Sequence, residues 1–166
     1  MRISTNILRD AEAEFDYIVT ENTQSLFEHL DDAMEQSGGC FNLIGSYGTG
    51  KSSFLLALEQ TLQGRKAHFK WTPPAGASYQ VIKLLGQPES IVGPLNKALG
   101  LRANTKLNKT LDTLLTWSKG SPRSMIFVDE LGKFVEYALQ NDPKKETYAF
   151  QQIAELVNDG SNSLTW

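Results

Sequence analysis

The sequence predicts an α/β fold with a mostly parallel sheet flanked by helices. Two observations support it: short apolar runs typical of buried strands, and amphipathic segments at helical spacing between them. Strands that alternate with helices along the chain favour a parallel sheet. The length of 166 residues is that of one domain.

The composition narrows the class of protein. Hydrophobic residues make up 40% and charged residues 21%, as in ordinary globular domains, and no stretch approaches the roughly 20 apolar residues of a membrane span. We therefore expect no membrane partner. The net charge of -3 excludes a domain that is basic throughout, although it leaves a local nucleic-acid contact open. The single cysteine, Cys40, excludes a disulfide framework, so we expect a reducing, cytoplasmic location.

Residues 1–38 are predicted to form a helical lead-in. Leu8, Ala11, Phe15 and Ile18 recur at helical spacing and predict a first helix. Residues 17–19 also suit a short extended piece, because they are aromatic and β-branched. A second apolar face predicts a helix over residues 26–34, which ends at Gly38 and Gly39. The candidate caps of this helix are Ser25 with Glu28 as a capping box, Asn22 and Thr23.

Residues 39–166 are predicted to form the core of the domain. A buried strand is expected over residues 40–44, then a glycine-rich loop and a helix with apolar residues from 54 to 62. Residues 66–71 alternate loosely and predict a second strand. The later elements are expected to be a short helix over 81–85, helices over 91–99 and 107–115, a strand over 125–128, a helix from Asp142-Pro143, and a strand beginning over 163–166.

A phosphate-binding motif lies between the first predicted strand and the helix after it. Residues 45–52 match G-x-x-x-x-G-K-[ST] at every fixed position, and the strand before and helix after provide the required context. Glycines let the backbone wrap around phosphate, and the helix N-terminus attracts the anion. Lys51 is expected to reach the β- and γ-phosphates, and Ser52 to offer a hydroxyl to Mg²⁺. The predicted nucleotide contacts are Gly45, Ser46, Tyr47, Gly48, Thr49, Gly50, Lys51, Ser52 and Ser53.

Two carboxylates follow the later apolar strand. Asp129 and Glu130 come directly after residues 125–128, at the end of the sheet where ligands bind in open α/β folds. We expect Asp129 to hold Mg²⁺ together with Ser52, and Glu130 to orient or deprotonate the attacking water. The predicted catalytic residues are thus Lys51 and Glu130.

Together, the two motifs resemble those of P-loop NTPases of the AAA+ and STAND type. Tyr47, residues 52–54 and residues 129–138 are similar to large bacterial ATPases of phage-defence and DNA-modification gene clusters. The resemblance implies one P-loop ATPase domain over residues 1–166, with ATP and Mg²⁺ as cofactors. It also implies that a helix like residues 151–157 leads into a strand with a polar sensor residue.

The resemblance further implies an incomplete domain. Such ATPases continue with a sensor strand, another strand and an arginine finger or lid, which would lie beyond Trp166. We therefore expect ATP binding and Mg²⁺-dependent hydrolysis as part of a larger ATPase. Other subunits or further chain are the expected partners, and these residues alone are expected to hydrolyse ATP weakly or not at all. The alternative is a nucleotide-binding switch or scaffold that does not hydrolyse. A nucleotide kinase ranks last, because residues 75–124 contain only two arginines.

Overall fold

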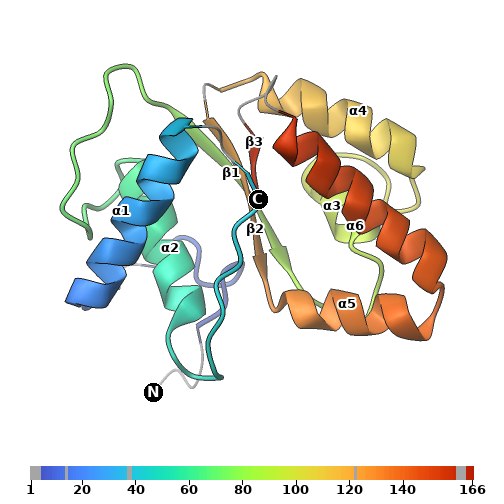
Figure 1. The fold of residues 1–166 in the computed structure, drawn as a ribbon, viewed down its shortest axis with the longest axis horizontal. Helices are drawn as coiled ribbons and strands as arrows, with labels where there is room; N and C mark the ends of the chain where they lie inside the picture. The colour runs from blue at the N-terminus through green and yellow to red at the C-terminus, as the bar shows by residue number, and fades with distance from the viewer. Residues whose placement is uncertain (1–4, 14, 37–38, 122, 160–163) are drawn as a thin grey trace.

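The computed structural model describes residues 5–13, 15–36, 39–121, 123–159 and 164–166. It confirms an α/β arrangement, in which a small parallel sheet lies between two groups of helices (Figure 1). Among the described residues, no helix has both the length and the apolar character of a membrane span.

The sheet has the order β1-β2-β3 within the described part of the chain. β1 (Tyr79–Leu85) and β2 (Arg123–Asp129) pair in parallel along their whole length, from Tyr79 opposite Arg123 to Leu85 opposite Asp129. β3 (Leu164–Thr165) pairs in parallel with the beginning of β2. β2, with a strand on each side, is therefore the central strand, and it ends at one of the predicted site residues.

A fourth segment runs along the outer side of β3. Gly39 forms a parallel bridge with Thr165, the Trp166 N–H donates to the Gly39 carbonyl at 3.0 Å, and the Phe41 N–H donates to the Trp166 carbonyl at 2.7 Å. The predicted strand over 40–44 is nevertheless wrong as an element, because the pairing stops at Phe41 and the Ile44 side chain is 85% exposed.

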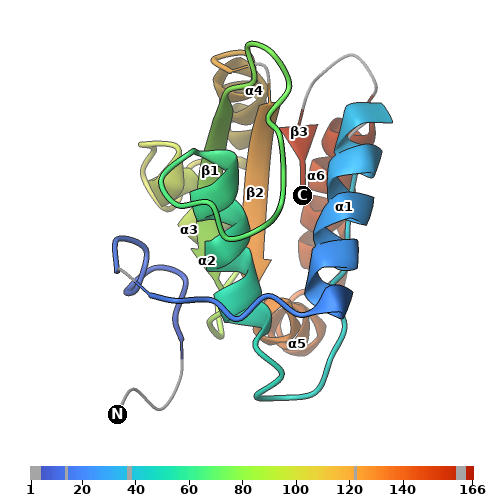
Figure 2. The same cartoon turned by 90° about the vertical axis from the view of Figure 1, so that its left-hand side faces the viewer.

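Helices cover both faces of the sheet. α1 (Glu21–Gln36) and α2 (Lys51–Leu62) lie on one face, and α3 (Val92–Ala98), α4 (Leu107–Ser118) and α6 (Pro143–Asn158) on the other (Figures 1 and 2). α5 (Leu131–Gln140) follows β2 directly at its carboxyl end. Each face has its own core because successive strand residues point to opposite sides: Met125 and Phe127 join the α1–α2 core, and Ile126 the α3–α6 core.

Most predicted helices are confirmed. The apolar faces over 26–34, 54–62, 91–99 and 107–115 lie in α1, α2, α3 and α4. α6 begins as predicted, with Pro143 in its first turn and the Asp142 carboxylate accepting the Lys145 N–H at 3.2 Å. The strands over 125–128 and 164–165 are also confirmed, while Ser163 lies outside the described residues.

The predicted helix over 81–85 is wrong, since these residues belong to β1. Val81 and Ile82 are β-branched and pack on opposite faces of the sheet, Val81 partly buried against the α1–α2 core and Ile82 buried in the α3–α6 core. A short apolar run fits both the helical period and the strand period, and pairing with β2 decided in favour of the strand.

The predicted strand over 66–71 is wrong as well, because this segment has no strand pairing in the structure. Its apolar residues instead fill the core between α1 and α2. The Phe69 ring stacks on Phe27 at 4.6 Å between centroids and meets Phe54 edge-on at 5.6 Å.

The beginning of the chain also differs from the prediction. Residues 7–12 form turns and residues 15–20 have no regular structure, so neither the helix nor the short extended strand is formed. α1 begins after Thr20, whose hydroxyl accepts the Thr23 N–H at 3.3 Å while the Thr23 hydroxyl accepts the Thr20 N–H at 2.9 Å. The predicted caps Ser25, Asn22 and Thr23 are therefore wrong, because α1 starts earlier than its apolar face.

Candidate functional site

The glycine-rich loop makes a tight turn into the first turn of α2. Gly48 (φ 80°) and Gly50 (φ 84°) have left-handed backbone conformations, which side chains with a Cβ rarely adopt. The Thr49 hydroxyl closes the turn by donating to the Ser46 carbonyl at 2.9 Å. Backbone conformation thus explains two of the loop's three glycines, of which Gly50 is a fixed position of the motif.

Lys51 is the first residue of α2, and its side chain folds back over the loop. Its Nζ donates to the carbonyls of Gly45 at 2.7 Å and of Ser46 at 2.8 Å. The first hydrogen bond within the helix runs from the Phe54 N–H to the Gly50 carbonyl at 2.9 Å. The amides of residues 51–53 consequently have no acceptor within α2, and they add to the positive end of the helix dipole. An ammonium group and a helix N-terminus meet here, an arrangement suited to an anion.

The remaining loop side chains differ in environment. Tyr47 is 91% exposed and projects into solvent. Ser52 is half-buried in the first turn of α2, next to Lys51. The Ser53 hydroxyl shares a 2.9 Å hydrogen bond with the Thr5 hydroxyl, so it also contacts the N-terminal segment. Of the nine predicted nucleotide contacts, residues 45–50 form the loop and residues 51–53 form the first turn of α2.

Asp129 and Glu130 stand at the carboxyl end of β2 in different environments. Asp129 is buried, and its Oδ1 accepts the Glu130 N–H at 3.0 Å. Glu130 has left-handed torsions (φ 55°, ψ 40°), unusual for a residue other than glycine, and it precedes the first turn of α5. Its exposed carboxylate forms an ion pair with Lys133 one turn along that helix.

Gly86, which is not among the predicted site residues, supports this turn. Its N–H donates to the Asp129 carbonyl at 2.8 Å, and a Cβ at Gly86 would lie 2.0 Å from the Glu130 carbonyl oxygen. The available signal was a glycine directly after an apolar, β-branched run, which marks a close backbone approach at a strand end. This signal was missed because residues 81–85 were expected to form a helix.

The two motifs meet at one cavity of about 620 Å³. Gly45 and Lys51 line it from the loop, and Asp129 and Glu130 from the end of β2. Its walls are largely apolar and come from α1, α2 and β2, for example Leu30, Leu55 and Phe127. The other predicted loop residues, Ser46 to Gly50, Ser52 and Ser53, do not line it.

The predicted metal ligands are chemically suited to Mg²⁺. The Ser52 hydroxyl and the Asp129 carboxylate are hard oxygen donors, the type that this cation prefers, and a site with few protein ligands leaves room for water and phosphate oxygens. Groups of three or more histidines, cysteines and acids that could hold a metal are absent from the described parts of the chain. The donor atoms of Ser52 and Asp129 are thus of the type that fits Mg²⁺.

Comparison of the sequence with models of known protein families gave no match, and comparison with curated proteins gave none either.

Proposed function

We propose that the chain binds the phosphates of ATP together with Mg²⁺ at the loop of residues 45–52, as the nucleotide-binding part of a larger ATPase. One observation carries the proposal: Gly45 and Lys51, at the two ends of the loop with left-handed glycines, line the same cavity as Asp129 and Glu130. Phosphate binding needs the loop, its lysine and the helix N-terminus, and metal-dependent hydrolysis needs the two carboxylates.

The contacts of Lys51 suggest how phosphate would be accepted. Its ammonium is held by the carbonyls of Gly45 and Ser46, so it is already positioned over the loop. A phosphate group would take over these hydrogen bonds and add those of the α2 amides. Ser52 and Asp129 would hold Mg²⁺, which neutralises phosphate charge when bound, and Glu130 would orient the attacking water.

Preference for ATP, partner subunits and a role in phage defence or DNA processing are proposed on the resemblance of the two motifs alone. Tyr47, residues 52–54 and residues 129–138 carry that resemblance. The arrangement of β3 is compatible with it, because α6 leads into a strand next to β2, where the resemblance expects the sensor strand.

A second candidate is a nucleotide-binding switch that does not hydrolyse. The ion pair between Glu130 and Lys133 favours it, because the ammonium occupies the carboxylate that would otherwise hold the attacking water. Phosphate release measured with saturating ATP–Mg²⁺, with and without candidate partner chains or DNA, separates the two. Binding without release in every mixture would support the switch.

Calorimetric titration of ATP–Mg²⁺ into the wild-type chain and Lys51→Ala tests the proposal. We expect the variant to bind at least roughly tenfold more weakly, the usual cost of losing a hydrogen bond to a charged group. Lys119→Ala, which removes an exposed lysine at the end of α4, is the matched control and should bind like the wild type. Equal affinity in Lys51→Ala, or no binding by a folded wild-type chain, would contradict the proposal.

A further inference from the structure

A basic surface lies on α3, on α4 and on the loop that joins them. It consists of four exposed cations, which are Lys97, Arg102, Lys106 and Lys109. No acid occurs between Glu89 and Asp112, although the chain as a whole has a net charge of -3. Figure 1 shows α3 and α4 on the side of the sheet away from α1 and α2, and the cavity has no lining residue in this part of the chain.

The charges of the basic surface are not neutralised by contacts within the protein. None of its four cations forms an ion pair with any residue that the structure describes. Cations elsewhere do, for example Lys83 with Glu59 and Arg123 with Glu35. The positive charge of the basic surface is therefore available to an anionic partner.

A buried polar network fixes the backbone that carries these cations. The Asn96 side chain is fully buried, and its amide donates to the carbonyls of Ala103 at 3.2 Å and of Thr105 at 2.9 Å. The equally buried Thr110 hydroxyl donates to the Asn96 Oδ1 at 2.6 Å. Because the network joins α3, the loop and α4, the four cations extend from one defined backbone arrangement.

The other side chains of the basic surface favour a nucleic acid over a protein as the partner. Protein interfaces depend on apolar and aromatic anchors at their centre, and none of the exposed large hydrophobic residues of the described chain lies within residues 92–118. The exposed neighbours of the cations include Asn104 and Asn108, whose amides suit phosphate and sugar oxygens. Single strands stack on exposed aromatic rings, which residues 92–118 lack, so a duplex contacted through its phosphates is favoured.

We propose that the basic surface binds the phosphate backbone of a nucleic-acid duplex without reading its sequence. Each cation would neutralise one phosphate and release its condensed counterions, so the affinity would fall as salt is added. Four such contacts predict a slope of log K against log salt concentration of about -3.6 at the steepest. The proposal rests on charge, exposure and the buried network, and it does not depend on nucleotide binding at Lys51.

Fluorescence anisotropy with a labelled DNA duplex of mixed sequence, at low salt and without ATP, tests the basic surface. The double variant Arg102→Ala/Lys106→Ala removes two of its four cations. The matched control, Lys70→Ala/Lys119→Ala, removes two exposed lysines outside the basic surface and changes the net charge equally. We expect the first variant to bind at least roughly tenfold more weakly, with a salt slope shallower by about 2, and the control to bind within about threefold of the wild type.

Equal weakening by the two double variants, or no binding by the folded wild-type chain at low salt, would overturn the proposal. Competition by poly-glutamate as effective as that by unlabelled duplex, at equal concentrations of anionic groups, would overturn the assignment to a phosphate backbone. Tighter binding of a single strand than of the duplex would overturn the assignment to a duplex. Unchanged ATP–Mg²⁺ binding in Lys51→Ala would contradict the proposed function alone, since these samples contain no nucleotide.

Discussion

At the scale of single residues, the site depends on backbone positions that tolerate no ordinary side chain. Gly48 and Gly50 give the loop its left-handed torsions, and Gly86 lets the end of β1 approach the turn at Glu130. Glu130 itself has a left-handed conformation despite its side chain. Strain of this kind persists where the surroundings enforce it, and it gathers at functional sites.

Gly86→Ala tests this close approach. The added Cβ would meet the Glu130 carbonyl oxygen at 2.0 Å, so the ends of β1 and β2 must move apart. We expect the free energy of unfolding to fall by about 1–3 kcal/mol, as in overpacked cores, and ATP–Mg²⁺ binding to weaken because Asp129 and Glu130 move.

Urea unfolding followed by circular dichroism measures the first effect and calorimetry the second. Gly132→Ala is the matched control: apart from the chain neighbours and the backbone of α5 itself, nothing lies within 4 Å of a Cβ there, and alanine favours the α5 helix. If Gly86→Ala were as stable as wild type, the close approach would not constrain the turn.

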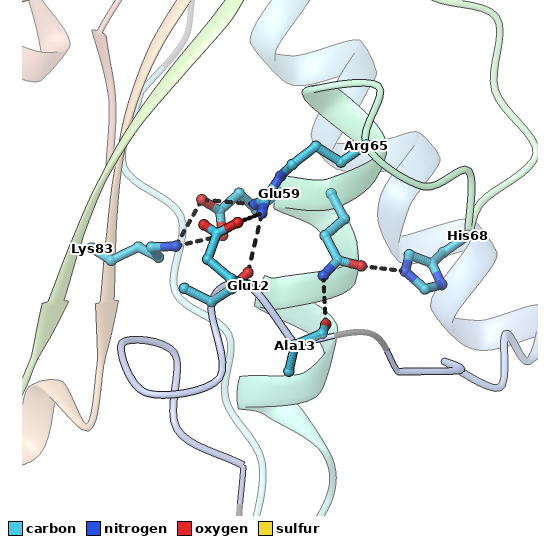
Figure 3. A network of polar contacts seen from close by, with 8 residues as sticks. Glu12, Ala13, Glu59, Arg65, His68 and Lys83 are labelled. Carbon is cyan, nitrogen blue, oxygen red and sulfur yellow. Dashed lines mark hydrogen bonds and ion pairs between the residues drawn. The ribbon is translucent and has the colours of Figure 1, made fainter.

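At the scale of secondary-structure elements, a buried ionic cluster joins α2 to the sheet (Figure 3). Glu59 of α2 is 4% exposed and accepts two hydrogen bonds from Lys83 of β1, at 2.8 and 2.9 Å. Arg65, just after α2, lies 3.3 Å from the same carboxylate. The cluster fixes the element that begins with Lys51 against the strand next to β2.

Glu59→Gln should destabilise the protein by about 2–3 kcal/mol, because it leaves the mostly buried ammonium of Lys83 without its charged partner. Glu12→Gln is the control within the same network: Glu12 also pairs with Arg65, but its side chain is 88% exposed, so the expected change is below about 0.5 kcal/mol. Equal urea midpoints for the two variants would show that the buried pair adds nothing.

At the scale of the whole molecule, one aromatic cluster ties the N-terminal segment to the helices. Phe15 and Tyr17 approach the His68 ring, at 5.3 and 6.2 Å between centroids, and Tyr17 also meets Phe69 at 5.7 Å. The His68 ring is hydrogen-bonded to Gln60 of α2 at 2.8 Å. Burial in this cluster, followed by the charge of Lys66, lowers the pKa of His68 below its ordinary 6.5.

The lowered pKa of His68 predicts a pH-dependent stability. Above the unfolded value of 6.5 the ring is neutral in both states, and as the pH falls below it the unfolded chain takes up the proton more readily than the native one. Stability is therefore lost from about pH 6.5 downward, until the native ring is protonated as well.

Urea midpoints at about pH 7.5 and about pH 5 check this effect. The fall on acidification should be smaller in His68→Gln than in the wild type, whereas His29→Gln, at an exposed position on α1, should follow the wild type. An unchanged fall in His68→Gln would assign the acid sensitivity to other groups.

The outcome of the predictions differs between long and short patterns. Long amphipathic segments were identified from sequence because the helical period repeats several times in each, and α6 also has a visible cap in Asp142. Short apolar runs were identified less consistently: the strand over residues 125–128 is confirmed, whereas three other runs differ from their predictions. In the structure, residues 81–85 form a strand, residues 66–71 form a loop that fills the core, and residues 40–44 pair only at their beginning. The conformation of each run depends on which segment of the chain packs beside it.

Sequence alone determined five of the helices (α1, α2, α3, α4 and α6), the α/β class, and a loop and a carboxylate pair with the residue types that Mg²⁺ and phosphate require. Local periodicity, glycine spacing and side-chain chemistry are properties of neighbouring residues, so they can be read along the chain. Only the tertiary structure decided that Lys51 and Glu130 border one cavity, that Gly86 contacts the turn at Glu130, and that β2 is the central strand. Those features depend on strand order and register, which arise from contacts between residues far apart in the chain.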